Sequence, residues 1–188
     1  MFAQRAWCVA KAWLRKPSQV ATICPSSSHL TQKLAERDCV RTASVIVELG
    51  PGEGGTSLAL LQQMPAQSRL LVIEKTSEFR EALQQISDSR FEYVIGDAAD
   101  LRQIVSARDL GSIDVIVSGI PFSAIADVTA RSIMQSIYEV LRPGGFFIAY
   151  QLRSDVEEFA RPYFGTGQSE TVPLNLPPLR VYWWQKAC

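Results

Sequence analysis

The fold is decided by the stretch Val45-Ile46-Val47-Glu48-Leu49-Gly50-Pro51-Gly52-Glu53-Gly54-Gly55-Thr56, an apolar run that leads into a glycine-rich turn. The run predicts a buried strand, because strands covered on both faces of a parallel sheet read as continuous hydrophobic segments. Gly50, Gly52 and Gly54 let the backbone turn tightly and leave no Cβ in the way of a ligand. The residues from Thr56 to Met64 then predict a helix whose first amides border that ligand. We therefore expect a nucleotide-type cofactor site here.

Further apolar segments along the chain also end in polar residues. Leu70–Glu74 ends in an acid about 20 residues after the turn, the spacing at which a carboxylate accepts hydrogen bonds from ribose hydroxyls. Tyr93–Ala98 carries Asp97, which suits an adenine amino group, and Ile113–Ser118 is a fourth apolar segment. Because the carboxyl ends of parallel strands meet at one edge of a sheet, we expect these ends to surround the ligand.

Glu48, the acid inside the first strand, indicates which cofactor binds. A carboxylate two residues before the first glycine would repel a pyrophosphate, and the dinucleotide fingerprint is Gly-x-Gly-x-x-Gly, which this turn does not match. Carboxylates suit a cationic cofactor without phosphate, and S-adenosylmethionine carries an ammonium and a sulfonium beside its adenosine. The alternative interpretation of Glu48 is a buried acid that the amides of the turn satisfy.

The sequence resembles class I S-adenosylmethionine-dependent methyltransferases in the Glu-x-Gly-x-Gly-x-Gly motif from Glu48, in Glu74 and in Gly96-Asp97-Ala98. It resembles, more narrowly, bacterial phospholipid N-methyltransferases in three segments: Ile23-Cys24-Pro25-Ser26-Ser27, Ser118-Gly119-Ile120-Pro121-Phe122 and Asn175-Leu176-Pro177-Pro178-Leu179-Arg180-Val181-Tyr182. The resemblance implies an α/β, Rossmann-like fold: a mostly parallel seven-stranded sheet with a C-terminal antiparallel hairpin and helices on both faces. Glu53 departs from the pattern, because such enzymes more often carry threonine there.

The resemblance and the strand ends together assign candidate site residues. We expect the cofactor to contact Glu48, Gly50, Gly52, Gly54, Glu74, Lys75, Asp97, Ala98 and Ser118. We expect the substrate to contact Ser26, Ser27, Pro121, Phe122, Arg153, Asn175 and Arg180. Tyr150 is the candidate catalytic residue, since a phenol at the end of a strand can accept or orient an amine, and Arg153 can pair with a phosphate. An ordinary strand edge would explain Tyr150 and Arg153 equally well, and Phe122 would fit the core as well as the substrate.

The second half of the chain predicts one more helix and a pair of terminal strands. A helix is expected from Asp127 to Leu141, where Arg142-Pro143-Gly144-Gly145 stops it, followed by the strand Phe146–Tyr150. Strands over Tyr163–Glu170 and Arg180–Gln185 are expected to form the hairpin. Its connection, Val172–Pro178, should then lie on the cofactor side of the sheet, either as a substrate wall or as protection of the sheet edge.

The N-terminal segment has the pattern of a cationic amphipathic helix. On a helical wheel of residues 2–16, the apolar side chains, two tryptophans among them, occupy one arc, and Arg5, Lys11, Arg15 and Lys16 occupy the other. Such a helix suits the interface of an anionic membrane, although a helix docked on the protein core would show the same pattern. We expect residues 1–40 to form this helix and a substrate lid, and residues 41–188 to form the cofactor-binding domain.

Length and composition narrow the remaining possibilities. A chain of 188 residues is a normal single domain, and its net charge of zero disfavours broad nucleic-acid binding. The four cysteines have no ligand-like spacing and His29 is the single histidine, so no metal site is expected. No apolar run has the roughly 20 residues needed to span a bilayer. We expect a cytoplasmic protein, bound peripherally to the inner face of the cell membrane.

These observations favour an S-adenosylmethionine-dependent N-methyltransferase that acts on phosphatidylethanolamine or a related aminolipid at the membrane surface. Two other enzymes stay open: a soluble small-molecule N-methyltransferase and an rRNA-adenine-type N-methyltransferase. The latter often carries Asn-Pro-Pro-Tyr after the fourth strand, where this chain has Ser-Gly-Ile-Pro-Phe. A cofactor-binding module without catalysis is a further alternative, because the sequence identifies no general base.

Overall fold

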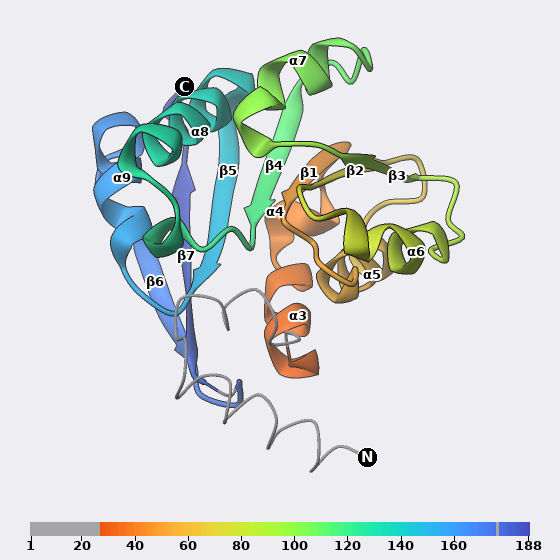
Figure 1. The fold of residues 1–188 in the computed structure, drawn as a ribbon, viewed down its shortest axis with the longest axis horizontal. Helices are drawn as coiled ribbons and strands as arrows, with labels where there is room; N and C mark the ends of the chain where they lie inside the picture. Colours follow the sequence, from red (N-terminus) through yellow and green to blue (C-terminus); the bar gives the residue numbers. More distant parts are fainter. Residues whose placement is uncertain (1–26, 176) are drawn as a thin grey trace.

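The structure, a computed structural model, describes residues 27–175 and 177–188 (Figure 1). The helix expected over residues 2–16 and the substrate residue Ser26 lie outside the described residues. The described chain forms a seven-stranded sheet in the order β3-β2-β1-β4-β5-β7-β6. Its strands are β1 (Val45–Leu49), β2 (Arg69–Glu74), β3 (Phe91–Ile95), β4 (Ile113–Ser118), β5 (Leu141–Gln151), β6 (Gln168–Val172) and β7 (Leu179–Gln185).

The strands pair as the resemblance implies. β1 pairs in parallel with β2 on one side and with β4 on the other, and β3 and β5 extend these pairs in parallel. β7 is antiparallel to both β5 and β6, which makes the terminal hairpin. The strand order therefore reverses between β1 and β4, and in open α/β sheets ligands bind beyond the carboxyl ends of the strands at this point.

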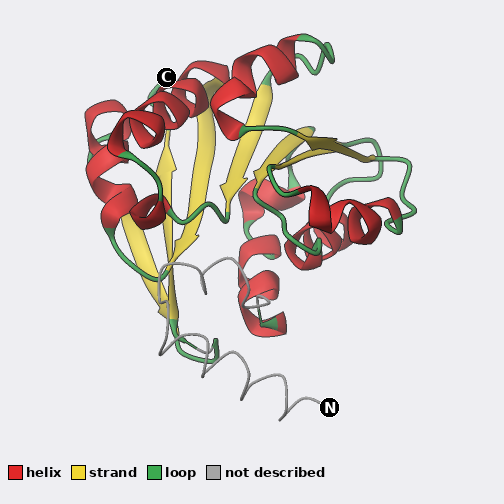
Figure 2. Cartoon of the chain, in the orientation of Figure 1, coloured by secondary structure: helices red, strands yellow, loops and turns green. Residues whose placement is uncertain are grey.

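Helices cover both faces of the sheet (Figure 2). The α-helices are α3 (Ser28–Ala35), α4 (Asp38–Arg41), α5 (Gly55–Gln63), α6 (Arg80–Gln84), α7 (Leu101–Ser106), α8 (Asp127–Val140) and α9 (Asp155–Phe164). The short 3-10 helices are η1 (Ser77–Phe79), η2 (Ala98–Asp100) and η3 (Phe122–Ala124). One core joins α7, α8 and α9 to the sheet, and a second core joins α3, α4, α5 and α6 to its other face. The fold class is confirmed.

The second core includes the start of the described chain. Leu30 and Leu34 of α3 are fully buried, and α3 packs closely on α5. Ser27 caps the helix, because its Oγ accepts the backbone N–H of Leu30 at 3.2 Å. Residues 28–35 are thus part of the folded body, and the division of the chain at residue 40 stays a prediction.

The amino edge of the sheet is fixed by one carboxylate. Asp114 in β4 accepts the backbone N–H groups of Ser44 and Val45 at 2.8 and 2.9 Å. Its other oxygen accepts Nε of Arg142 at 2.6 Å. The Arg142 guanidinium and these amides hold the pKa of Asp114 below its usual value, against the effect of its partial burial. This carboxylate aligns the starts of β1, β4 and β5, which sets the register with which their carboxyl ends meet at the opposite edge.

The segment before the hairpin differs from the sequence prediction. The strand expected over Tyr163–Glu170 is wrong in its first half, because Tyr163 and Phe164 end α9 and β6 begins at Gln168. α9 buries Val156, Phe159 and Ala160, which lie on one face at helical spacing. β5 also begins earlier than expected, at Leu141, and includes the Pro-Gly-Gly segment. Its pairing with β4 shifts register between Ile113 and Val115, and this irregularity accommodates the extra residues.

Candidate active site

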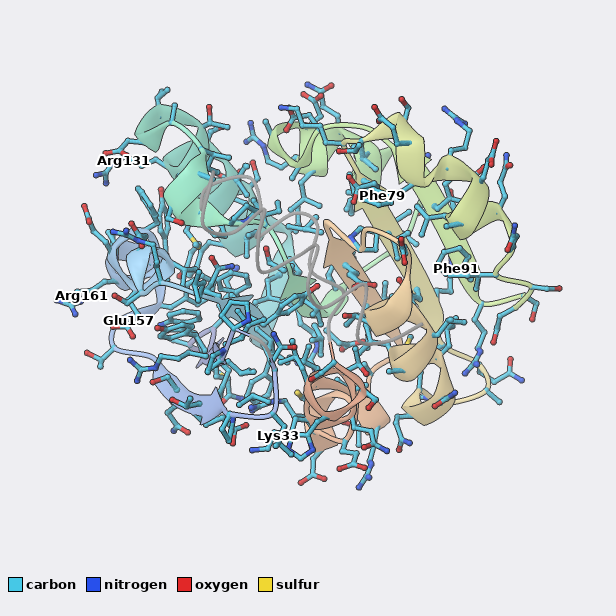
Figure 3. All side chains as sticks on the ribbon, turned by 60° about the horizontal axis from the view of Figure 1, so that its bottom comes forward. Lys33, Phe79, Phe91, Arg131, Glu157 and Arg161 are labelled. Atoms are coloured by element: carbon cyan, nitrogen blue, oxygen red, sulfur yellow. The ribbon has the colours of Figure 1, made fainter. Side chains whose placement is uncertain are left out.

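A cavity of about 380 Å³ lies at the carboxyl edge of the sheet, where the strand order reverses. Its wall is built from the segments that follow β1, β2, β3, β4 and β5, together with residues of α8. Figure 3 turns this edge toward the reader and shows Phe79, which lines the cavity, and Arg131 of α8 on different sides of the view. The volume lies within the range of small-molecule and cofactor sites.

Many of the residues singled out in the sequence analysis lie around this cavity. Eight candidate residues line it: Gly50, Gly52, Glu74, Lys75, Asp97, Ala98, Pro121 and Tyr150. Glu53, whose contact with cofactor the sequence left open, lines it as well. The remaining candidates among the described residues lie beneath the wall or away from the cavity, as described below.

The glycine-rich turn forms one wall of the cavity. Gly52 has a φ of +58° and a Cβ added there would meet nothing within 4 Å, so the turn requires glycine for its backbone conformation. Gly54, with a φ of +84°, is the N-cap residue of α5 and lies behind the wall, where a Cβ would meet the side chain of Ile86 at 2.8 Å. The turn thus presents bare backbone to the cavity on one side and packs tightly on the other.

Glu74 joins the end of β2 to this turn. Its Oε2 accepts the backbone N–H of Gly52 at 3.0 Å, and its Oε1 accepts the backbone N–H of Thr76 at 2.8 Å. The side chain is nearly buried but lines the cavity, so its remaining lone pairs face the ligand space. A carboxylate held in this way has acceptor capacity left for two hydroxyl donors on a ribose.

Asp97 and Lys75 form an ion pair at the end of β3. Their atoms Oδ2 and Nζ are 2.7 Å apart, and Asp97 Oδ1 accepts the backbone N–H of Ala99 at 3.0 Å. This amide and the ammonium group lower the pKa of Asp97, which keeps its carboxylate ionised at neutral pH. The carboxylate can then accept a hydrogen bond from a ligand amine.

Glu48 and Ser118 lie beneath the cavity wall. Glu48 is fully buried, and its Oε2 accepts Oγ–H of Ser57 at 2.5 Å. Burial raises the pKa of Glu48 to about 7; the Ser57 hydrogen bond opposes this shift and the charge of Glu74 adds to it. Its Oε1 has no hydrogen-bond partner among the described residues. Glu48 therefore supports the turn from behind and holds a protonation state that depends on pH near neutrality.

The far end of the cavity is mostly apolar. Ile120, Pro121, Ile125 and Ile133 line it together with Tyr150, the candidate catalytic residue. The turn that carries Ile120 is held by Gln151, whose Nε2 donates to the Ile120 carbonyl at 2.7 Å and whose Oε1 accepts the Phe122 N–H at 3.3 Å. These bonds fix the turn that carries Ile120, which packs against the glycine turn at Gly50.

Five expected substrate residues do not line this cavity. Phe122 is buried in the core against Phe159, so it takes the core position that the sequence analysis gave as the alternative to substrate contact. Ser27 and Asn175 bind each other, since Asn175 Oδ1 accepts the Ser27 N–H at 2.9 Å. Two arginines have partners at the protein surface: Arg153 pairs with Asp155 at 3.1 Å, and Arg180 donates to Ser169 at 3.0 Å.

The sequence analysis missed the residues that α8 and its approach contribute. Ile125, Thr129 and Ile133 recur every four residues and line the cavity along one stripe. Apolar residues of an amphipathic helix read as core, and only the polar Thr129 within this stripe signals a solvent-filled space. Phe79 was also missed, because nothing in its local sequence distinguishes it from a packing residue.

Comparison with known proteins agrees with this geometry. The family model of the methyltransferase domain matches residues 46–145. The ornithine lipid N-methyltransferase of Singulisphaera acidiphila is 29% identical over 166 residues, which cover 87% of this chain and 86% of that protein. The ribosomal RNA small subunit methyltransferase A of Phenylobacterium zucineum is 32% identical over 97 residues, which cover 50% of this chain and 32% of that protein.

Solved methyltransferase structures share the fold. The 1,6-didemethyltoxoflavin-N1-methyltransferase of Burkholderia thailandensis superposes with a TM-score of 0.64 and 18% identity, covering 84% of this chain and 77% of that one. The N-methyltransferase NodS of Bradyrhizobium japonicum superposes with a TM-score of 0.61 and 15% identity, covering 77% of this chain and 78% of that one. The chain belongs to the methyltransferase-domain family. It is an S-adenosylmethionine-dependent methyltransferase, and S-adenosylmethionine is its cofactor.

The residues present fit this cofactor. Glu74 offers acceptors to the ribose hydroxyls, Asp97 offers one to the adenine amino group, and the bare glycine turn leaves space for the remainder. No phosphate needs to be accommodated next to these two carboxylates. The cofactor supplies an electrophilic methyl group on its sulfonium.

Replacing Gly119 with alanine should reduce methyl transfer. The new Cβ would meet the phenol of Tyr150, with Cζ only 2.7 Å away, and the carbonyl oxygen of Gly50 at 2.9 Å. Either the candidate catalytic side chain or the cofactor turn must move, and a displacement of this size costs on the order of 100-fold in rate. Single-turnover kinetics with bound cofactor would measure the loss.

A matched control is Gly111→Ala, in the turn before β4 at the amino edge of the sheet. A Cβ there meets nothing within 4 Å, although the φ of +71° makes alanine strained. Gly111→Ala should lower the free energy of unfolding but leave the rate of methyl transfer unchanged. Equal rates for Gly119→Ala and the parent would show that neither Tyr150 nor the turn is positioned as described.

Proposed function

We propose that this protein is an N-methyltransferase that acts on the primary amine of phosphatidylethanolamine or a related aminolipid, ornithine lipids included. The observation that carries the proposal is the similarity to the ornithine lipid N-methyltransferase, because it extends over 87% of this chain and 86% of that protein. The match to the ribosomal RNA enzyme covers only 32% of that protein. The apolar far end of the cavity also suits a lipid amine better than a polar nucleobase.

The described residues suggest how the reaction proceeds. In-line attack on the methyl group requires a neutral amine, so the substrate ammonium must first lose its proton to solvent. The new N–C bond would then replace the S–C bond of the cofactor, whose thioether would be the leaving group. Tyr150 lies at the cavity wall between the glycine turn and the apolar end, where its phenol oxygen can accept a hydrogen bond from the amine and orient its lone pair. The isoleucines around it exclude water, and most of the rate comes from positioning.

The setting of the enzyme follows from the same proposal. We infer that the basic segment of residues 2–16 binds the anionic inner face of the cell membrane, that residues 1–40 contribute a lid, and that neither metal nor nucleic acid takes part. Within the part of the chain that the structure describes, no helix is both long and apolar enough to cross a bilayer.

Methyl transfer from labelled S-adenosylmethionine tests the proposal. Vesicles that contain phosphatidylethanolamine or an ornithine lipid should yield labelled, extractable lipid, whereas ribosomal RNA and soluble amines should yield none. Tyr150→Phe should retain cofactor binding and lower kcat by about 10-fold or more, because the phenol oxygen is lost. Labelled RNA, or no labelled lipid from an enzyme that binds the cofactor, would refute an aminolipid substrate.

A further inference from the structure

We propose that the carboxyl edge of the sheet docks on a lipid bilayer through an apolar rim at the edge that holds the cavity. The rim consists of Leu58, Val128, Leu152 and Leu174, whose residues are 48%, 75%, 38% and 69% exposed. They are the large apolar side chains classed as exposed in the described ranges 27–175 and 177–188. The inference rests on the proposed function and adds to it the surface through which lipid reaches the site.

The four rim residues come from separate segments that meet at one edge. Leu58 lies in the first turn of α5, which follows β1, and Val128 lies in the first turn of α8, which follows β4. Leu152 directly follows β5, and Leu174 lies in the loop between β6 and β7. Because each of these points adjoins the carboxyl end of a parallel strand or its antiparallel partner, all four lie at the edge that holds the cavity.

This distribution is unusual for a protein surrounded by water on all sides. Single exposed apolar residues are normal on a surface, but they would then be scattered over both edges and the outer helix faces. Here the amino edge of the sheet carries Asp114 and Arg142 in an ion pair and none of the four apolar residues. A one-sided apolar rim is typical of a surface that enters another phase or a partner.

The point where residues 1–26 join the body indicates that the partner is a bilayer. Asn175 holds the backbone of Ser27 at 2.9 Å and also donates its Nδ2 to the Pro177 carbonyl at 2.9 Å. Ser27, the first described residue, is therefore fixed beside the segment that carries Leu174, and the basic amphipathic sequence of residues 2–16 precedes this point in the chain. A membrane-binding segment and an apolar rim at the same edge can engage one flat surface together.

The charges at this edge indicate that the rim and the N-terminal segment contribute to membrane binding in different ways. Arg153 follows Leu152 but is paired with Asp155, and Asp127 precedes Val128, so neither of these two rim residues adjoins an unpaired positive charge. Attraction to anionic lipid would come from residues 2–16 and weaken with salt, whereas the contribution of the rim should not depend on salt. Binding to zwitterionic vesicles at high salt thus isolates the rim.

The test compares the full-length parent with Val128→Gln/Leu174→Gln. Flotation is measured with phosphatidylcholine vesicles in about 0.5 M salt, which screens most electrostatic attraction. The fraction of protein that floats with the vesicles should fall by at least about 10-fold in this variant. Turnover of vesicle-bound phosphatidylethanolamine should fall with it, while turnover of a monomeric short-chain analogue should not change. Unchanged flotation would overturn the docking surface, which is also the result expected if residues 1–26 or a second copy of the chain cover the rim.

A second variant tests whether exposed apolar side chains at any place on the surface would cause vesicle binding. Adding Ser106→Leu and Ser112→Leu to the double variant restores two exposed apolar side chains, but at the other end of α7 and before β4, away from the cavity. Flotation should stay low, and recovery would overturn the proposal. If the parent methylates no aminolipid, short-chain analogue included, while the rim variant still loses flotation, then the docking surface stands and the proposed function fails.

Discussion

Replacing Glu74 with alanine is expected to weaken binding of S-adenosylmethionine by about 100-fold or more. The carboxylate accepts the backbone N–H groups of Gly52 and Thr76, and it is the candidate acceptor for the ribose hydroxyls. Hydrogen bonds to a charged group contribute about 1.5–3 kcal/mol each, so the loss of two toward the ligand costs at least about 3 kcal/mol. Isothermal titration calorimetry with the cofactor and with its demethylated product would measure the change.

A suitable control is Glu78→Ala, which removes an exposed acid from η1, four residues along the chain. It changes the net charge equally and should leave affinity within about 2-fold, since exposed charges at this distance are largely screened. Cooperative unfolding of both variants would show that the fold is retained. If Glu74→Ala bound the cofactor like the parent, the ribose assignment would have to be abandoned.

Glu48→Gln is expected to flatten the pH dependence of stability. Burial raises the folded-state pKa of Glu48 to about 7, well above its ordinary value of 4.5. Between these two pH values the native state holds a proton that the unfolded chain releases, so the free energy of unfolding falls as pH rises and levels off above pH 7. The total loss is about 3 kcal/mol, and a glutamine, which does not titrate, should not show it.

Urea unfolding of the cofactor-free protein between pH 4.5 and pH 8 covers this window. The two proteins should be most similar at the acidic end, where Glu48 is protonated in the native state and half protonated in the unfolded chain, and the variant should be the more stable one at pH 8. Ser57→Ala provides a further check, because loss of its hydrogen bond should raise the pKa of Glu48, so that the stability of this variant keeps falling to a higher pH than that of the parent. Parallel curves for Glu48→Gln and the parent would show that Glu48 stays ionised when buried.

The parallel part of the fold could be predicted because its strands are buried on both faces. β1, β2 and β4 are continuous apolar runs that a turn residue or an acid ends, and such runs have few alternative interpretations. α9 could not be distinguished in the same way. Its buried face is only three residues wide within a polar segment, and Pro162 lies inside it, which favours a loop or an edge strand in the sequence alone.

In the candidate site, too, the sequence predicts the position of some residues and not of others. Glu74 and Asp97 could be placed because each ends a strand, and strand ends converge at one edge. The position of Asn175 could not be predicted, because its partner Ser27 is 148 residues away in the chain. Both its side-chain oxygen and its side-chain nitrogen form hydrogen bonds within the protein. Glu48 is an intermediate case: the sequence singles it out, but its side chain is fully buried and bonded to Ser57, and it does not line the cavity.

The antiparallel direction of β7 has a practical consequence for anyone who purifies or immobilises this enzyme. β7 starts opposite Gln151 and runs back toward the amino edge, where Lys186 is tied to the carbonyls of Tyr138 and Leu141 at 2.7 Å. The last residues thus point away from the cavity mouth. An affinity tag after Cys188 would let the protein be captured on a sensor chip with its cofactor edge facing the flowing sample.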